Sequence, residues 1–81
     1  MRKFDTLGAV KRAVGRGEIK PVMVVFAPGK IGGDKYLAFD SAQRGLDCCI
    51  ELLEDGCQAD VHYFNGRWHE PPPKFQDLRL F

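Results

Sequence analysis

The stretch from residue 36 to residue 69 constrains the fold more than any other part of this chain. An apolar segment precedes an amphipathic one, and a second alternating segment leads into Asn65-Gly66. Repeats of two residues are typical of strands, and repeats of 3.6 residues are typical of helices. The pattern predicts a strand at 36–39, a helix at 40–55, a strand at 58–64, a tight turn at 65–66 and a strand at 67–69.

The helix expected at residues 40–55 has clear start and stop signals. Asp40 followed by Gln43 resembles a capping box, in which each side chain binds a free backbone N–H of the first turn. Gly56 supplies the left-handed conformation at which many helices end. The apolar stripe expected to face the core consists of Ala42, Leu46, Cys49, Ile50 and Leu53, and the acidic row opposite consists of Asp47, Glu51 and Glu54.

The Asn65-Gly66 pair favours a two-residue type I′ turn, which fixes the register of the two strands that it joins. Strict alternation then places Ala59, Val61, Tyr63 and Trp68 on one face, which we expect to be buried. The opposite face presents an aromatic ring and a guanidinium between two imidazoles. These four residues form the first candidate partner-binding surface: His62, Phe64, Arg67 and His69.

The first half of the chain predicts one helix and one central strand. Asp5 or Thr6 is a suitable cap for a helix that runs to about Val14. Residues 22–26 are apolar at odd and even positions alike, which indicates a strand covered on both sides or one face used for association. The glycine-rich residues 28–34 are expected to form the loop to the next strand.

Together these elements predict a small α+β domain, with an antiparallel sheet of about four strands and two helices in the order α-β-β-α-β-β. We assign residues 1–70 to this domain and residues 71–81 to a Pro-rich connection and an apolar C-terminal tail. The tail contains four large apolar residues, Phe75, Leu78, Leu80 and Phe81. We expect the tail to pack on its own domain or on another chain. The second arrangement, or pairing of an exposed strand, would produce a homodimer.

Composition narrows the class of protein. With 81 residues, the chain is long enough for one modest core. Three cysteines, two of them adjacent at positions 48 and 49, are unlike the even, spaced set of a disulfide scaffold and favour reduced thiols. No apolar segment has the length of a signal-peptide core or of a bilayer-spanning helix. We therefore expect a cytoplasmic protein without a membrane partner.

The residues that could bind phosphate, bind a metal ion or act as nucleophiles do not have the spacing that these functions require. The glycine-rich loop lacks the spacing of a phosphate-binding loop and precedes a strand. Spacing along helix and strand does not bring the cysteines, His62 and His69 together as a closed zinc site. Ser41 has a capping role available, and acidic neighbours raise the pKa of Cys48 away from the reactive thiolate. We expect no catalytic residues, no metal and no cofactor.

Charge is unevenly distributed along the chain, although the net charge is only +1. Residues 1–35 contain eight Lys or Arg against three Asp or Glu, whereas residues 36–81 contain four against eight. The acidic helix row of Asp47, Glu51 and Glu54 is the second candidate partner-binding surface. The alternative is a nucleic-acid-binding surface in the basic half, built from Lys11, Arg12, Arg16 and Lys30.

These observations favour a non-catalytic cytoplasmic binding protein that modulates or inhibits a macromolecular partner, a protein or a nucleoprotein complex. In size and in its lack of a catalytic constellation the chain is similar to accessory proteins of phages and mobile elements, such as anti-CRISPR-type inhibitors. A nucleic-acid-binding module is the second interpretation, and a thiol-dependent or small-molecule enzyme is the third. The order of strand, Phe-x-Ser, helix, Gly and strand also resembles half of a SPOR-type peptidoglycan-binding domain, but the export signal expected for such a domain is missing, and we do not adopt this assignment.

Overall fold

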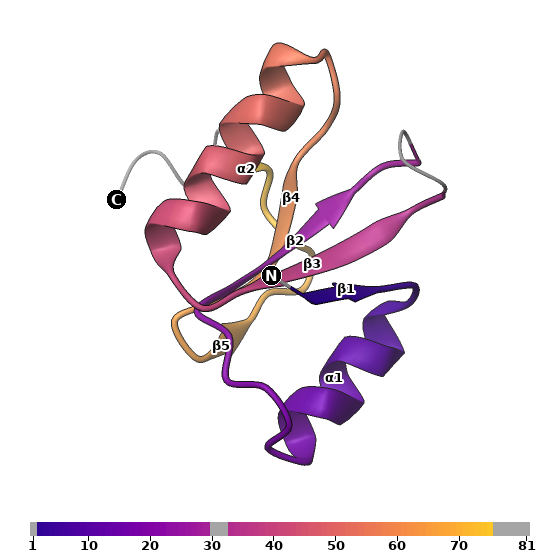
Figure 1. Ribbon diagram of the computed structural model, residues 1–81, viewed down its shortest axis with the longest axis vertical. Helices are drawn as coiled ribbons and strands as arrows, with labels where there is room; N and C mark the ends of the chain where they lie inside the picture. The colour runs from indigo at the N-terminus through magenta and orange to yellow at the C-terminus, as the bar shows by residue number, and fades with distance from the viewer. Residues whose placement is uncertain (1, 30–32, 76–81) are drawn as a thin grey trace.

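A five-stranded antiparallel sheet separates two helices, one on each face (Figure 1). The computed structural model describes residues 2–29 and 33–75. Its elements are β1 (Arg2–Phe4), α1 (Leu7–Gly15), β2 (Met23–Ala27), β3 (Lys35–Phe39), α2 (Ala42–Glu54), β4 (Asp60–Phe64) and β5 (Arg67–Trp68). The strand order is β1-β3-β2-β4-β5. The α+β class and the two helices are as the sequence predicts. Neither helix in the described part is long and apolar enough to cross a bilayer.

The sheet has one strand more than the sequence pattern indicates. β1 pairs antiparallel with the outer edge of β3, with Lys3 opposite Leu37. The expected order therefore gains a strand before α1. Three residues are too few to show an alternation of apolar and polar side chains, so the sequence carried no signal for β1.

The central position of β2 confirms the expectation for an apolar segment without alternation. Met23 and Val25 pack on the α2 side, while Val24 packs on the α1 side, and all three are fully buried. Because β2 lies between a helical layer on each face, successive side chains at its start are buried on both sides of the sheet.

The N-cap of α2 lies one residue later than predicted. Ser41, not Asp40, is the N-cap, and its Oγ accepts a hydrogen bond from the Arg44 backbone N–H at 3.2 Å. The buried stripe is also rotated from the predicted one, since Ile50 is 44% exposed and Gly45 is buried. Gly45 lies against Met23, where an added Cβ would stand 2.4 Å from Sδ. This close approach fixes which side of α2 faces the sheet.

α1 agrees closely with its prediction. Thr6 is the N-cap, and its Oγ1 accepts from the Ala9 backbone N–H at 3.1 Å. Val10 and Ala13 are buried against the sheet. Gly17 follows the helix with a positive φ of 75°, the conformation expected where a helix ends in glycine.

The hairpin turn and its register are confirmed. Asn65 and Gly66 have φ values of 50° and 87°, as a type I′ turn requires, and Tyr63 is opposite Trp68. The predicted placement of Val61, Tyr63 and Trp68 on one face of the hairpin is wrong, however. The pairing of β2 with β4 shifts between Val24 and Val25, which is a β-bulge. Because a bulge inserts an extra residue, it reverses the alternation along the rest of the strand.

The bulge distributes the hairpin side chains between two faces. Val61 packs on the α2 side, whereas Tyr63 packs on the α1 side with Trp68. Phe64 returns to the α2 side, opposite Met23, where it is half-buried against the core. The face expected to be exposed is therefore not a single face.

The chain after β5 returns to the sheet. The Val61 backbone N–H donates to the Pro73 carbonyl at 3.0 Å, and the Phe75 N–H donates to the Ala59 carbonyl at 2.9 Å. Phe75 is 7% exposed in the core beneath α2. This part of the tail packs on its own domain, while Leu78, Leu80 and Phe81 lie outside the described residues.

Candidate functional site

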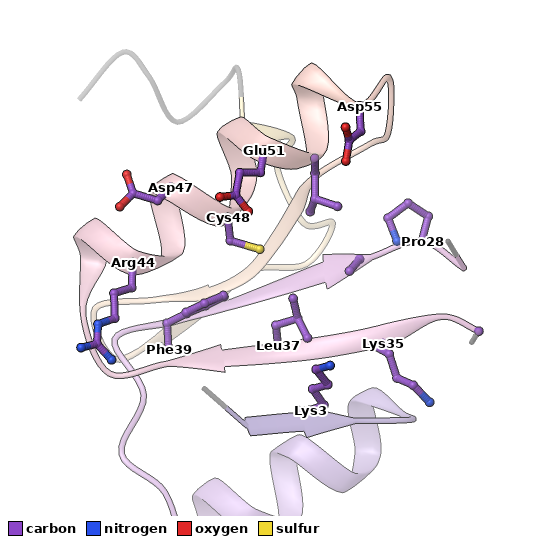
Figure 2. A pocket seen from close by; sticks show the side chains of 13 residues that line it. Lys3, Pro28, Lys35, Leu37, Phe39, Arg44, Asp47, Cys48, Glu51 and Asp55 are labelled. Carbon is purple, nitrogen blue, oxygen red and sulfur yellow. The ribbon is translucent and has the colours of Figure 1, made fainter. Parts of the chain in front are cut away.

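A groove of about 400 Å³ runs between α2 on one side and β1 and β3 on the other (Figure 2). It lies on the α2 side of the sheet, beside the region that the helix covers. The lining residues are Lys3, Ala27, Pro28, Gly33, Lys35, Leu37, Phe39, Arg44, Asp47, Cys48, Glu51, Leu52 and Asp55. Within the described part of the chain, this groove combines an apolar surface with charged groups of both signs.

The apolar surface of the groove comes from alternation along β3 and from one side of α2. Leu37 and Phe39 project toward α2 and belong to its core cluster. Cys48 and Leu52, four residues apart on α2, pack against the same cluster, and Figure 2 shows Cys48 pointing into the groove. Because positions four apart lie on one side of a helix, these two side chains form a continuous apolar wall.

An acidic row follows the same helix. Asp47, Glu51 and Asp55 are successive positions four residues apart, and all three line the groove and are exposed. Asp47 Oδ1 accepts from Gln43 Nε2 at 2.8 Å, which orients that carboxylate. We call these three residues the acidic row of the groove.

Cations stand on the strand side. Lys3 of β1 lies opposite Leu37 in the sheet register, and Lys35 of β3 forms an ion pair with Asp5. The ion pairs Lys35–Asp5 and Arg16–Glu18 do not span the groove. Arg44 of α2 also lines the groove, so the helix side carries charges of both signs, whereas the strand side carries Lys3 and Lys35.

Burial makes the thiols of Cys48 and Cys49 poor nucleophiles. Burial raises the pKa of Cys48, and the neighbouring carboxylate of Glu51 raises it further. The sequence argument gave the right direction but named only the acidic neighbours, which contribute less. Burial also raises the pKa of Cys49 to about 12. Neither thiol has the depressed pKa of a reactive cysteine.

The side chains considered for zinc are dispersed. Within the described residues, no group of three or more His, Cys, Asp or Glu side chains is arranged to hold a metal ion. Cys49 is in the core beneath α2, and His62 is on the opposite face of the sheet among aromatic rings.

The four hairpin residues of the first candidate surface do not form one surface. His62 packs against the rings of Phe26 and Tyr36 on the α1 side, with centroid distances of 6.4 and 5.3 Å. Phe64 packs on the α2 side, and Arg67 is exposed. His69 is half-buried, and its backbone N–H donates to the His62 carbonyl at 2.9 Å. Partner binding by individual members of this set stays a prediction.

The structure divides the second candidate surface as well. Asp47 and Glu51 line the groove, whereas Glu54 lies on another side of α2, near Ile50, Leu53 and Phe75. All three carboxylates are exposed. Asp47 and Glu51 of the predicted row thus belong to the groove, and Glu54 lies outside it.

The basic residues of the alternative surface lie mainly on α1. Lys11 stands over the Trp68 ring at 5.3 Å, and Arg16 pairs with Glu18 at 3.2 Å. Arg12 is exposed. Lys30, the fourth member, lies outside the described residues. Binding of nucleic acid by these cations stays a prediction.

Sequence reasoning missed the groove, because most of its lining comes from pairings between distant segments. Lys3, Leu37 and Phe39 carry no special signal in the sequence. The usable signal was the succession of Asp47, Glu51 and Asp55 one turn apart, directly beside Cys48 and Leu52. No family model, no curated protein and no solved structure matches this chain.

Proposed function

We propose that the protein is a non-catalytic binding protein that modulates a protein partner, and that the groove beside α2 holds a segment of that partner. The observation that carries the proposal is the groove itself, an apolar surface bordered by charged side chains of both signs. Its volume of about 400 Å³ is within the range of about 300–1,000 Å³ of typical ligand sites.

The two kinds of surface have different parts in this proposal. Leu37 and Phe39 are only 8% and 5% exposed. The apolar area that is desolvated when an anchoring side chain enters therefore comes mainly from half-buried lining residues, Ala27, Pro28, Cys48 and Leu52. The charged sides orient the segment and discriminate among partners, because complementary charge contributes more to specificity than to affinity. The raised pKa of Cys48 fits a binding role better than nucleophilic catalysis.

The test fills the groove without changing its charge. Cys48→Phe places a ring in the groove, and Cys57→Phe makes the same substitution at another half-buried cysteine outside it. Circular dichroism and thermal melting first establish that both variants fold. Partners captured from the native host by the wild type are then purified, and their affinities are measured by calorimetry.

We expect Cys48→Phe to weaken the purified complex by about tenfold or more, and Cys57→Phe to leave it within about twofold. Equal affinity of the wild type and Cys48→Phe would remove the groove as the binding site. If the same preparations instead bind nucleic acid at about 50 mM salt, through Lys11 and Arg12 and regardless of Cys48→Phe, the nucleic-acid interpretation replaces this one.

A further inference from the structure

A second hollow, of about 450 Å³, lies on the side of α2 away from the groove. The described residues that line it are Ile50, Leu53, Glu54 and Phe75, and none of them lines the groove. Phe75 belongs to the core beneath α2 and Leu53 packs against that core, but Ile50 is 44% exposed. Among residues 2–29 and 33–75, no other large apolar side chain is exposed. This side of α2 therefore presents apolar surface that the described chain does not cover.

The sequence of α2 makes the exposure of Ile50 unexpected. Ile50 lies four residues after Leu46 and three before Leu53, so the three side chains share one side of the helix. Leu46 and Leu53 are half-buried and pack against the core. An isoleucine in the middle of such an apolar row is typical of a buried position. Another apolar segment lying against Ile50 would complete the buried row.

The chain itself supplies such a segment at the edge of the hollow. Phe75, the last described residue, lines the hollow and is held there by its backbone, whose N–H donates to the Ala59 carbonyl at 2.9 Å. Six residues follow outside the described part, and three of them are large and apolar: Leu78, Leu80 and Phe81. Six residues reach about 9 Å as a helix and about 20 Å when extended. Both lengths are sufficient to enter a hollow that begins at Phe75.

We infer that residues 76–81 of the same chain dock in this hollow and cover Ile50 and Leu53 with their apolar side chains. The two sides of α2 then have different occupants, a partner segment in the groove and the chain's own residues in the hollow. This docking does not depend on the proposed function, because the hollow and the groove share no lining residue among those described.

Tethering favours the chain's own segment over one from another molecule. A short connection gives an attached segment an effective concentration in the millimolar range, far above that of a second copy in a micromolar solution. Charge does not oppose the docking, because Asp77 and Arg79 leave the segment without net charge and Glu54 is the charged group among the described lining residues. The association is therefore mainly apolar, and we expect it to depend little on salt.

Thiol labelling on α2 tests the docking. Ile50→Cys places a thiol in the hollow, and Glu51→Cys places a matched thiol one residue later, on the groove side. Both are made together with Cys48→Ser and Cys57→Ser, so that the fully buried Cys49 is the remaining native thiol. Labelling rates are compared at a temperature at which Cys49 does not react, which excludes labelling through global unfolding.

Two variants of residues 76–81 provide the comparison. One replaces the apolar side chains (Leu78→Ser, Leu80→Ser and Phe81→Ser), and the other replaces the polar ones (Gln76→Ser, Asp77→Ser and Arg79→Ser). We expect the apolar replacement to lower the melting temperature by about 4–12 °C and to speed labelling of Ile50→Cys by about tenfold or more. Labelling of Glu51→Cys should stay within about twofold. The polar replacement should leave both rates within about twofold.

Three outcomes would overturn the docking. An unchanged labelling rate of Ile50→Cys after the apolar replacement would do so, whatever happens to the melting temperature. Equal acceleration of Ile50→Cys and Glu51→Cys would mean that residues 76–81 stabilise the domain without covering the hollow. If sedimentation shows that the wild type is a dimer and the apolar replacement a monomer, the segment in the hollow comes from a second copy.

The partner complex separates this docking from the proposed function. Because the groove is on the other side of α2, the apolar replacement should leave the calorimetric affinity for the partner within about twofold, whereas Cys48→Phe should weaken it. If Cys48→Phe has no effect while labelling of Ile50→Cys accelerates as expected, the docking stands and the proposed function fails. If the apolar replacement weakens the partner complex by about tenfold and leaves labelling unchanged, residues 76–81 contact the partner and the docking is wrong.

Discussion

The two faces of the sheet differ in how completely the protein's own side chains cover them. On the α1 side, the area beyond the helix is covered by rings that contact one another, since Phe26 and Tyr36 have centroids 5.2 Å apart and His62 lies against both. On the α2 side, the corresponding area is the groove. At this end of the sheet, one face is therefore filled by its own side chains, and the other leaves room for another molecule.

The difference comes from two neighbouring pairs in the register of β2 and β3. Phe26 lies opposite Tyr36, and both project to the α1 side, where two large rings meet. The next pair, Ala27 opposite Lys35, belongs to the α2 side. Alanine leaves space, and the Lys35 ammonium reaches Asp5. A shift of one residue thus separates a filled face from an open one, because side chains alternate along a strand.

The largest expected effect tests whether both faces are core. Val24 and Val25 are neighbours in β2, and each is fully buried, one on the α1 side and one on the α2 side. Val24→Ala and Val25→Ala should each lower the free energy of unfolding by about 2–3 kcal/mol, because each removes buried methyl groups and leaves a cavity. Urea unfolding at constant pH measures both.

Ile50→Ala is the control for this pair, because Ile50 is 44% exposed on α2. It should cost less than about 1 kcal/mol. If one of the two valine variants proved as mild as Ile50→Ala, that face of the sheet would not be a packed core.

Sequence patterns predicted the elements whose signals are local. Thr6 and the apolar spacing located α1, and Asn65-Gly66 fixed the turn, because caps and turns depend on a few adjacent residues. The absence of alternation in β2 correctly placed it at the centre of the sheet.

Features that depend on pairing or close packing were not predictable in this way. The bulge opposite Val24 and Val25 reverses the faces of β4, and no local signal in His62 or Tyr63 announces it. The rotation of α2 depends on contact between Gly45 and Met23, which are far apart in sequence. The groove depends on the placement of α2 and on the pairing of β1 with β3. Of its acidic row, the prediction therefore included only Asp47 and Glu51.

The next largest effect compares the same substitution in the two helices. In α2, Gly45→Ala would place Cβ 2.4 Å from Met23 Sδ and 3.2 Å from its Cβ and Cγ. Met23 is fully buried, so it has little room to move. We expect a loss of about 1–2 kcal/mol in the free energy of unfolding, after the gain of about 1 kcal/mol in helix propensity.

In α1, Gly8→Ala should act in the opposite direction. Its nearest atom is Arg12 Nη1 at 3.4 Å, the end of an exposed and flexible side chain. We expect a gain of about 0.5–1 kcal/mol from helix propensity.

A double-mutant cycle tests whether Met23 sets the cost of Gly45→Ala. Met23→Ala removes Sδ and Cγ and leaves only Cβ at 3.2 Å, so it should remove most of that cost. An undiminished cost in the Met23→Ala background would show that contact with the Met23 side chain does not set it.

The smallest expected effect concerns the filled face and its dependence on pH. Burial among the rings lowers the pKa of His62 from 6.5, Asp60 opposes this shift, and Lys11 adds to it. Below pH 6.5 the unfolded chain binds a proton at this site more readily than the folded protein does. The contribution of His62 to stability is therefore complete above pH 6.5, and it is lost as the pH falls from 6.5 through the lower folded-state pKa.

Urea unfolding between about pH 5.5 and 7.5 should show a decline in the free energy of unfolding toward acid pH that is smaller in His62→Gln. Lys11→Gln should weaken the decline and Asp60→Asn should steepen it, because they remove influences of opposite sign on the same imidazole. An identical decline in the wild type and in His62→Gln would mean that the imidazole is not enclosed by Phe26 and Tyr36, and the α1 side would then be as open as the α2 side.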